Sequence, residues 1–325
     1  MFLALLILAL VFDFLNGFHD SSNIVATVIS SRALHPRLAL VLAAISEFVG
    51  PFLFGVAVAR TIGHDLLVDS ALNEQVVLAA LIAAVIWNLA TWFIGLPSSS
   101  SHALLGGLIG AALIYVKNVN VIQVNGLMKV VLALFLSPLF GIVAGFIIMR
   151  VTLWLVRGAS PRISGVFRRT QILTLVGLGL SHGTNDAQKT MGVIALGLFL
   201  TGRIPSFYIP LWVIAASAGA IALGTAFGGW RLIRTLGGRI YRIRPIHGFT
   251  SQIAGAGVIL AGALFGGPVS TTQVMSSAIV GVGAAERVNK VRWTILRDML
   301  LAWVLTIPIT AAIAGIAFYL LNLVA

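Results

Sequence analysis

The sequence predicts an all-α polytopic membrane protein made of two inverted-topology repeats, each with a broken helix and a re-entrant helical hairpin. Three observations predict this fold class. Hydrophobic residues make up 59% of the 325 residues and charged residues only 9%, whereas a soluble domain has roughly 25% charged residues. Long apolar runs recur along the chain, and several reach the ~20 residues that cross the hydrocarbon core of a bilayer. Two polar motifs also occur twice, in the same order.

The charge distribution excludes several other classes of protein. The net charge is +12, but the Lys and Arg residues sit in short breaks between apolar runs rather than on one water-facing stripe. That pattern predicts a lipid bilayer as the partner and no nucleic acid. The absence of cysteine excludes thiolate metal sites. No basic residue precedes Arg32, and Asp13 interrupts the first apolar run, so we expect the N-terminal segment to be mature structure rather than a cleaved signal peptide.

The apolar runs place the membrane segments in order. Each run is bounded by charged residues or by Gly, Pro and Ser, which interrupt helices. Segments are expected near residues 2–15, 21–29, 38–59, 76–96, 99–116, 127–156, 172–200, 207–230, 252–266, 269–282 and 299–324.

The polar breaks between these segments repeat. Residues 16–20 read Asn-Gly-Phe-His-Asp and align with His-Gly-Thr-Asn-Asp at 182–186, while residues 95–102 align without gaps on residues 266–273. Such internal repeats are typical of transporters. The alignment predicts a first repeat over residues 1–158, a basic cytoplasmic linker over 159–170, and a second repeat over 171–325.

The arginines predict how the repeats are oriented. Residues 149–171 and residues 231–248 each hold five arginines and no acid. Lys- and Arg-rich loops lie on the cytoplasmic side of membranes. Counting crossings from these loops gives each repeat an odd number, so the second repeat is inverted. It also predicts a multi-pass protein of the cell (plasma) membrane, with both chain ends outside.

Asp20 and Asp186 mark the first pair of breaks. A carboxylate in hydrocarbon costs at least ~3 kcal/mol, so it is paired or faces water. The glycines beside both residues predict interrupted helices, in which freed N–H groups attract an anion while carbonyls and the carboxylate attract a cation. The alternative is an aspartate that merely pairs with an arginine and fixes the fold.

The second pair of breaks joins two apolar helices through a proline and a cluster of hydroxyl residues. We interpret both as re-entrant hairpins, because irregular backbone at membrane depth must line protein or a water-filled cavity. If each hairpin instead crosses the membrane fully, both ends of the hairpin still lie on the same side. A second alternative is that the serines only allow close packing between helices. Hydroxyl groups and helix N-termini suit a tetrahedral oxyanion. The candidate substrate-binding hydroxyls are those of Ser99, Ser100, Ser101, Ser270, Thr271 and Thr272.

Other buried polar residues are harder to interpret. Glu47 lies within the 38–59 segment with no partner nearby in sequence, so a cation site and a structural role stay equally open. The three histidines at the breaks lack a spaced partner ligand and favour hydrogen bonding over metal binding. Asp13 is expected to cap or pack near a helix end. The histidines concerned are His19, His102 and His182.

These motifs resemble those of the inorganic phosphate transporter (PiT) family. That family carries Gly-Ala-Asn-Asp-x-x-Asn in each inverted half and Pro-x-Ser-Thr-Thr-His farther along. Here residues 17–23 read Gly-Phe-His-Asp-Ser-Ser-Asn and residues 183–189 read Gly-Thr-Asn-Asp-Ala-Gln-Lys. The hairpin motifs read Pro-Ser-Ser-Ser-Ser-His at 97–102 and Pro-Val-Ser-Thr-Thr-Gln at 268–273.

The resemblance implies import of inorganic phosphate by alternating access in symport with H⁺ or Na⁺. It implies no enzyme activity, no cofactor and no resident metal. The resemblance alone suggests a homodimer. Carried over by position, it places Asp20, Asn23, Asn185 and Asp186 at the cation and phosphate sites, with the hydroxyl clusters on phosphate.

Three positions depart from the family pattern: His19, Lys189 and Gln273. Lys189 stands where Asn23 stands in the first half, and its ammonium group would repel a sodium ion. We therefore expect one sodium site fewer and coupling that leans toward protons or a metal–phosphate complex. The full set of candidate cation-coupling residues is Asp20, Asn23, Glu47, Asn185, Asp186 and Lys189.

Two alternatives to phosphate symport stay open from the sequence. A sulfate permease of the same family is one, although sulfate has no proton to donate to the aspartates. An anion channel is the other, less consistent with duplicated inverted halves. An intramembrane enzyme would need a nucleophile with a base in reach, and Gln273 stands where His102 stands beside the first serine cluster.

Overall fold

The computed structural model describes residues 1–67, 71–118, 122–235 and 241–324. Within these ranges every regular element is a helix, which confirms the all-α class. The first part of the chain forms α1 (Phe2–Ser30), α2 (Pro36–Phe54), α3 (Ala57–Gly63), α4 (Glu74–Ile94), α5 (Ser100–Val116) and α6 (Val124–Leu155). The second part forms α7 (Ile163–Leu200), α8 (Leu211–Phe227), α9 (Trp230–Arg234), α10 (Pro245–Leu264), α11 (Thr271–Arg287), the 3₁₀ turn η4 (Val288–Lys290) and α12 (Trp293–Val324).

The described part of the chain contains six helices that are long and apolar enough to cross a membrane. Their large apolar side chains are often exposed, as on α6 at Leu139 and Phe140 and on α12 at Leu301 and Val304. Such faces are stable against lipid and not against water. The multi-pass membrane protein is therefore confirmed. The six helices are α1, α2, α4, α6, α10 and α12.

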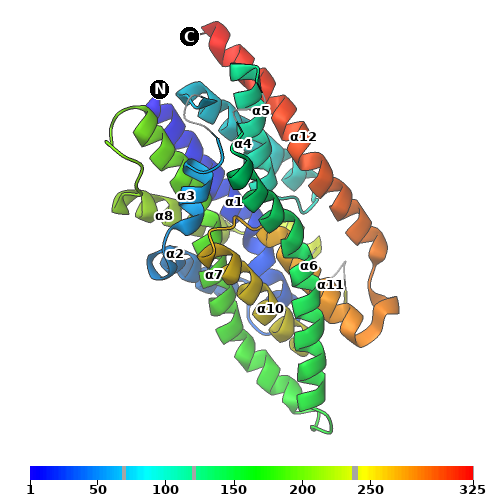
Figure 1. The fold of residues 1–325 in the computed structure, drawn as a ribbon. Coiled ribbons are helices and arrows are strands. Elements are labelled where there is room, and N and C mark those ends of the chain that lie inside the picture. The colour runs from blue at the N-terminus through cyan, green and yellow to red at the C-terminus, as the bar shows by residue number, and fades with distance from the viewer. Residues whose placement is uncertain (68–70, 119–121, 236–240, 325) are drawn as a thin grey trace.

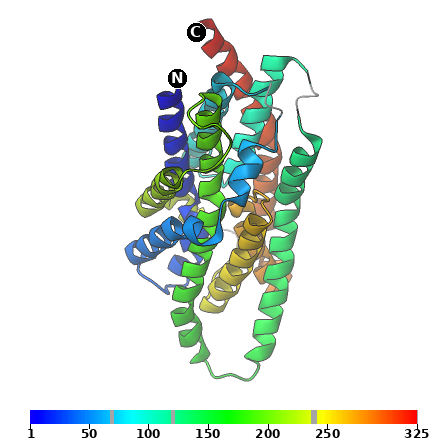
Figure 2. The same cartoon turned by 60° about the vertical axis from the view of Figure 1, so that its left-hand side comes forward.

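Two long helices, α1 and α7, run in opposite directions through the middle of the molecule (Figures 1 and 2). The N-terminus and the C-terminus lie at one end, and the turn between α6 and α7 lies at the other. The predicted linker over 159–170 is only partly a loop, because α7 already begins at Ile163.

The predicted breaks in these two helices are wrong. α1 continues through residues 16–23 and α7 through residues 182–189. The glycines serve close packing instead. A Cβ atom on Gly17 would lie 2.1 Å from the carbonyl oxygen of Ile221, and one on Gly183 would lie 2.2 Å from that of Glu47. Glycine therefore lets the backbones of α8 and α2 approach α1 and α7, rather than ending either helix.

The two helical hairpins, α4–α5 and α10–α11, turn inside the protein. The connecting residues 97–99 and 266–270 are buried, and both turns lie near mid-height of the fold (Figure 1). Ser99 and Ser270 cap α5 and α11 by accepting from the backbone N–H groups of His102 and Gln273. These caps explain why the helices restart directly after the proline loops.

The last helix of each half packs on the hairpin of the other half. α6 lies against α11, and α12 lies against α5 (Figure 1). A Cβ on Gly281 of α11 would meet the Ile142 carbonyl of α6 at 2.1 Å, and one on Gly110 of α5 would meet the Ala311 carbonyl of α12 at 2.3 Å. Small residues at such crossings allow helices to pack tightly in membranes, where no hydrophobic force brings them together.

A polar layer separates two apolar layers in the core. Along α1, Leu5 and Phe12 belong to one buried apolar cluster and Ile24 to the other. Along α7 the order is reversed, with Leu178 in the second cluster and Ile194 in the first. Both helices carry most of their buried polar residues between these positions, at 13–23 on α1 and 181–190 on α7.

The close crossing of α7 and α2 gives a prediction for stability. Gly183→Ala should lower the melting temperature, because the new methyl forces backbone atoms apart at a cost of about 1–3 kcal/mol. Gly177→Ala on the same helix is the control: nothing lies within 4 Å of its Cβ position, so it should leave stability unchanged or slightly raised. Thermal unfolding of the purified protein in detergent measures both. Equal effects of the two substitutions would contradict the close-packing role.

Candidate functional site

The polar layer at the centre of α1 and α7 holds a cluster of ionisable side chains. Asp20 and Asp186 face each other there, and helix α11 brings hydroxyl groups between them. None of the principal side chains is more than 3% exposed; they are Asp20, Glu47, His182, Asn185, Asp186, Lys189, Thr271 and Thr272.

Three side chains lie within hydrogen-bond distance of the Asp20 carboxylate, two of them far away in sequence. The Thr272 hydroxyl donates to Oδ1 at 2.9 Å, and the Thr271 hydroxyl donates to Oδ2 at 3.1 Å. Nδ1 of His19 lies 2.9 Å from Oδ1. The Asn23 amide donates to the Thr272 hydroxyl at 3.0 Å and so holds Thr272 in position.

The Asp186 carboxylate is paired with an ammonium group. Nζ of Lys189 donates to Oδ1 at 2.6 Å, and the Asn185 amide donates to the same oxygen at 2.6 Å. Lys189 lies one helical turn after Asp186 and is itself fully buried. It thus occupies, with its own positive charge, the place where a cation would otherwise balance Asp186.

One hydroxyl group joins the two carboxylates. Oγ1 of Thr271 lies 3.1 Å from Oδ2 of Asp20 and 3.0 Å from Oδ2 of Asp186. A hydroxyl has a single proton to donate, so it satisfies only one of two ionised carboxylates. The second contact is favourable when that carboxyl group carries a proton or when a cation binds beside it. The arrangement therefore favours uptake of a positive charge.

His182 connects this pair to Glu47. Its Nε2 lies 3.4 Å from Oδ2 of Asp186 and 3.9 Å from Oδ2 of Asp20, while its Nδ1 lies 2.7 Å from Oε1 of Glu47 on α2. Asp20, His182 and Asp186 each offer one ligand atom, and these atoms lie within 4.8 Å of one another. They form a candidate cation site of oxygen and nitrogen donors.

The carboxyl groups of the polar layer outnumber its lysines, and two histidines, His19 and His182, lie among them. Four carboxyl groups lie within it, and Lys189 is its one buried ammonium group among the described residues. An unpaired charge in a low-dielectric interior costs about several kcal/mol, similar to the loss of stability when one partner of a buried ion pair is removed. The remaining negative charge must be neutralised by protons or by bound cations. The carboxyl groups are those of Asp13, Asp20, Glu47 and Asp186.

The two hydroxyl clusters take different places. In the second cluster, Thr271 and Thr272 reach the carboxylates, while Ser270 caps α11. In the first cluster, Ser100 donates to the Asn16 amide oxygen at 2.7 Å and Ser101 donates to the Val269 carbonyl at 3.2 Å.

The tips of the two hairpins also contact each other. His102 and Gln273, which align in the two motif copies, lie 3.1 Å apart from Nδ1 to Nε2. Asn185 fixes the second tip by donating to the Val269 carbonyl at 3.0 Å and accepting from its N–H at 3.3 Å. Both tips, and with them both helix N-termini, therefore meet at the polar layer.

Sequence reasoning missed part of this site. Asp13 was expected near a helix end, but it lies inside α1 with no exposure, and neither of its oxygens forms a hydrogen bond of good geometry with a residue that the structure describes. The signal was present in the helical spacing: alternate steps of three and four residues place one polar stripe along α1. The predicted break at Gly17 concealed it. The stripe consists of Asp13, Asn16, Asp20, Asn23 and Thr27.

His182 was interpreted only as a hydrogen-bonding residue without a partner. Its partners come from three different helices, two of which no sequence spacing relates to it. The one local signal is its position a single turn before Asp186. That spacing indicates a shared helix face once the helix is taken as continuous.

Comparison with known proteins identifies a family that matches most of the chain. The model of the phosphate transporter family matches residues 16–314, which covers both motif pairs. A protein of Bacillus subtilis named "Probable low-affinity inorganic phosphate transporter" is 44% identical over 98% of this chain and 97% of its own length. A protein of the same name from Rhizobium meliloti is 43% identical over 99% of this chain and 96% of its own length.

The fold is also similar to a solved structure, "The sodium-dependent phosphate transporter". The TM-score is 0.89 at 25% identity, over 100% of this chain and 99% of that one. These relatives are transporters, not enzymes, as expected from the sequence. The extent of the family match and the identities to full-length relatives lead to one conclusion: the chain belongs to the phosphate transporter family.

Proposed function

We propose that this protein is a secondary active symporter that imports inorganic phosphate together with H⁺ or Na⁺ by alternating access. One observation carries the proposal: the Thr271 hydroxyl lies between two buried carboxylates, in a layer with four carboxyl groups and a single lysine among the described residues. The names of the relatives support phosphate as the substrate, and the sodium-dependent neighbour supports a co-transported cation.

Coupling follows from charge. Phosphate carries one or two negative charges near neutral pH, and the polar layer is already rich in carboxyl groups. The anion can enter only when protons or metal cations have neutralised those groups, because unpaired buried charge is costly. Cation binding therefore raises the affinity for phosphate, and by linkage phosphate raises the affinity for the cation by the same factor.

We place the cation at Asp20 and Asp186, with His182 and Thr271 as further donors. Glu47 and Lys189 set the local charge, and Asn23 and Asn185 hold the hydroxyl groups and the hairpin tip. Phosphate would bind beside the N-termini of α5 and α11, where the first N–H groups of a helix lack intrahelical partners. Hydroxyl donors there come from Ser99, Ser100, Ser101, Ser270, Thr271 and Thr272.

The repeated contacts support two related halves, over residues 1–158 and 171–325. Gly17 meets Ile221 of α8 as Gly183 meets Glu47 of α2, and each partner helix belongs to the other half. Such mutual exchange is what a two-fold axis produces. With the arginine-rich loops cytoplasmic, the chain ends lie outside the cell. The site is buried from both sides, so transport requires these halves to move against each other.

Loss of either central carboxylate should abolish coupled uptake. Asp20→Asn and Asp186→Asn each leave the Thr271 hydroxyl with a single charged partner and remove a cation ligand. We expect phosphate uptake into proteoliposomes to fall more than tenfold. Asp298→Asn is the control, because Asp298 is exposed on α12 and contacts only Arg297 among the described residues. Near-normal gradient-driven uptake in Asp186→Asn would refute the proposed site.

Lys189 decides which cation couples. Because its ammonium group balances Asp186 at 2.6 Å, we expect a pH gradient to drive uptake in the parent protein. Lys189→Asn removes this charge, and sodium should then stimulate uptake more strongly. The measurement is initial uptake under separate Na⁺ and H⁺ gradients. Strict sodium dependence without any pH response in the parent would overturn the role given to Lys189.

Asp13 is the candidate carrier of a coupling proton. Its carboxyl group is fully buried with Thr190 as a neighbouring hydroxyl residue, and the charges that act on it come from Asp186 and Lys189 of α7 and Glu47 of α2. Asp13→Asn imitates the protonated acid. It should preserve phosphate exchange at equal pH on both sides and lose stimulation by a pH gradient. Asp298→Asn again serves as the control, and full stimulation in Asp13→Asn would exclude this role.

A further inference from the structure

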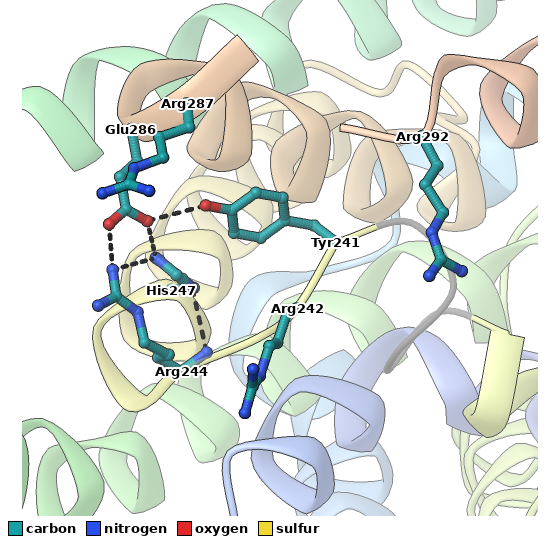
Figure 3. Close-up of a pocket in the computed structure, with 7 residues that line it drawn as sticks. All are labelled: Tyr241, Arg242, Arg244, His247, Glu286, Arg287 and Arg292. Carbon is teal, nitrogen blue, oxygen red and sulfur yellow. Dashed lines mark hydrogen bonds and ion pairs between the residues drawn. The ribbon is translucent and has the colours of Figure 1, made fainter. Parts of the chain in front are cut away.

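A basic pocket of about 480 Å³ opens at the base of the α10–α11 hairpin, away from the two chain ends. Four arginines line it (Figure 3). Arg242 and Arg244 precede α10, Arg287 ends α11, and Arg292 precedes α12. The pocket lies at the opposite end of the hairpin from Thr271, so it is separate from the central site.

The single acidic residue that lines the pocket, Glu286, already has three polar partners. Glu286 is paired with Arg244, its Oε2 lies 2.6 Å from Nε2 of His247, and the Tyr241 hydroxyl donates to it at 2.8 Å. Burial, followed by the hydrogen bond to Glu286, raises the pKa of Tyr241 to about 12. The phenol therefore stays a donor at any physiological pH, and the Glu286 group acts as a fixed clamp.

The other arginines are left without an acid. Arg242, Arg287 and Arg292 are exposed and form no ion pair with any residue that the structure describes. With His247 neutral, the pocket carries a net charge of +3 from its four arginines and Glu286. Arg242 and Arg292 extend from separate segments of the chain into the space beside Tyr241 (Figure 3).

We propose that this pocket binds a phosphate dianion, either free inorganic phosphate or the phosphate monoester headgroup of an anionic lipid. Guanidinium groups bind phosphate oxygens in pairs and carry their charge at every physiological pH. A bound dianion would bridge the arginines before α10 to those after α11 and would hold the base of the hairpin together. This site is additional to the proposed transport site and does not depend on it.

The test is phosphate binding to the full-length protein in nanodiscs of phosphatidylcholine alone. We expect two classes of site for labelled phosphate in the parent. In the double variant Arg242→Gln/Arg292→Gln one class should disappear or weaken at least tenfold, while the other remains. Arg157→Gln/Arg162→Gln removes the same charge from the exposed α6–α7 turn and is the matched control. An equal loss of phosphate binding in this control would show that only the overall positive charge matters, and it would overturn the proposal.

A second arm separates the two sources of phosphate. Nanodiscs that also contain phosphatidic acid are compared with the phosphatidylcholine discs, and retained lipid is read by native mass spectrometry. If the headgroup is the ligand, the parent should retain phosphatidic acid and lose the second class of phosphate binding, and the double variant should not retain the lipid. If the parent protein shows only one class of phosphate site and retains no phosphatidic acid, the proposal that this pocket binds phosphate is wrong. Phosphate binding at the central site in the same experiment would still support the proposed transport function.

Discussion

The Thr271 hydroxyl has one proton to offer and two carboxylates within reach, Asp20 and Asp186. Because both acids are buried, water cannot make up the difference. Further positive charge would stabilise the pair, and in the symport that we propose this requirement links cation binding to anion binding. The hairpin tip, the lysine on α7 and the histidine between the acids all act on that same balance. In the symport that we propose, coupling therefore follows from the balance of buried charge.

Close helix packing makes such burial achievable. Gly17 and Gly183 let neighbouring backbones approach the two central helices, so side chains from α2, α8 and α11 reach the polar layer. A kinked helix would have supplied free backbone groups instead. Here the helices stay continuous, and the donors come from side chains and from the N-termini of the hairpin helices. The apolar clusters on either side then shield the layer toward both ends.

The two copies of each aligned motif differ in the charges that they bring to the polar layer. Asn23 holds Thr272 in place, whereas Lys189 at the aligned position neutralises Asp186. His102 and Gln273, also aligned, bind each other across the hairpin tips. A polar layer that were symmetric in charge would present two equal cation sites. This one presents a fixed charge on one side and an exchangeable charge on the other, which is why we expect proton coupling.

The sequence by itself determined the membrane class and the family motifs, and it indicated Asp20, Asp186 and the hydroxyl residues of both hairpins as candidates for the site. These conclusions follow from composition and from the spacing of residues along the chain, neither of which depends on the folded structure. Only the tertiary structure decided that α1 and α7 run unbroken, that Glu47 joins the site through His182, and that Thr271 lies between both acids. A glycine in the sequence can end a helix or can let a neighbouring helix approach closely, and the sequence alone does not distinguish these two roles. The choice depends on contacts between segments that lie far apart along the chain.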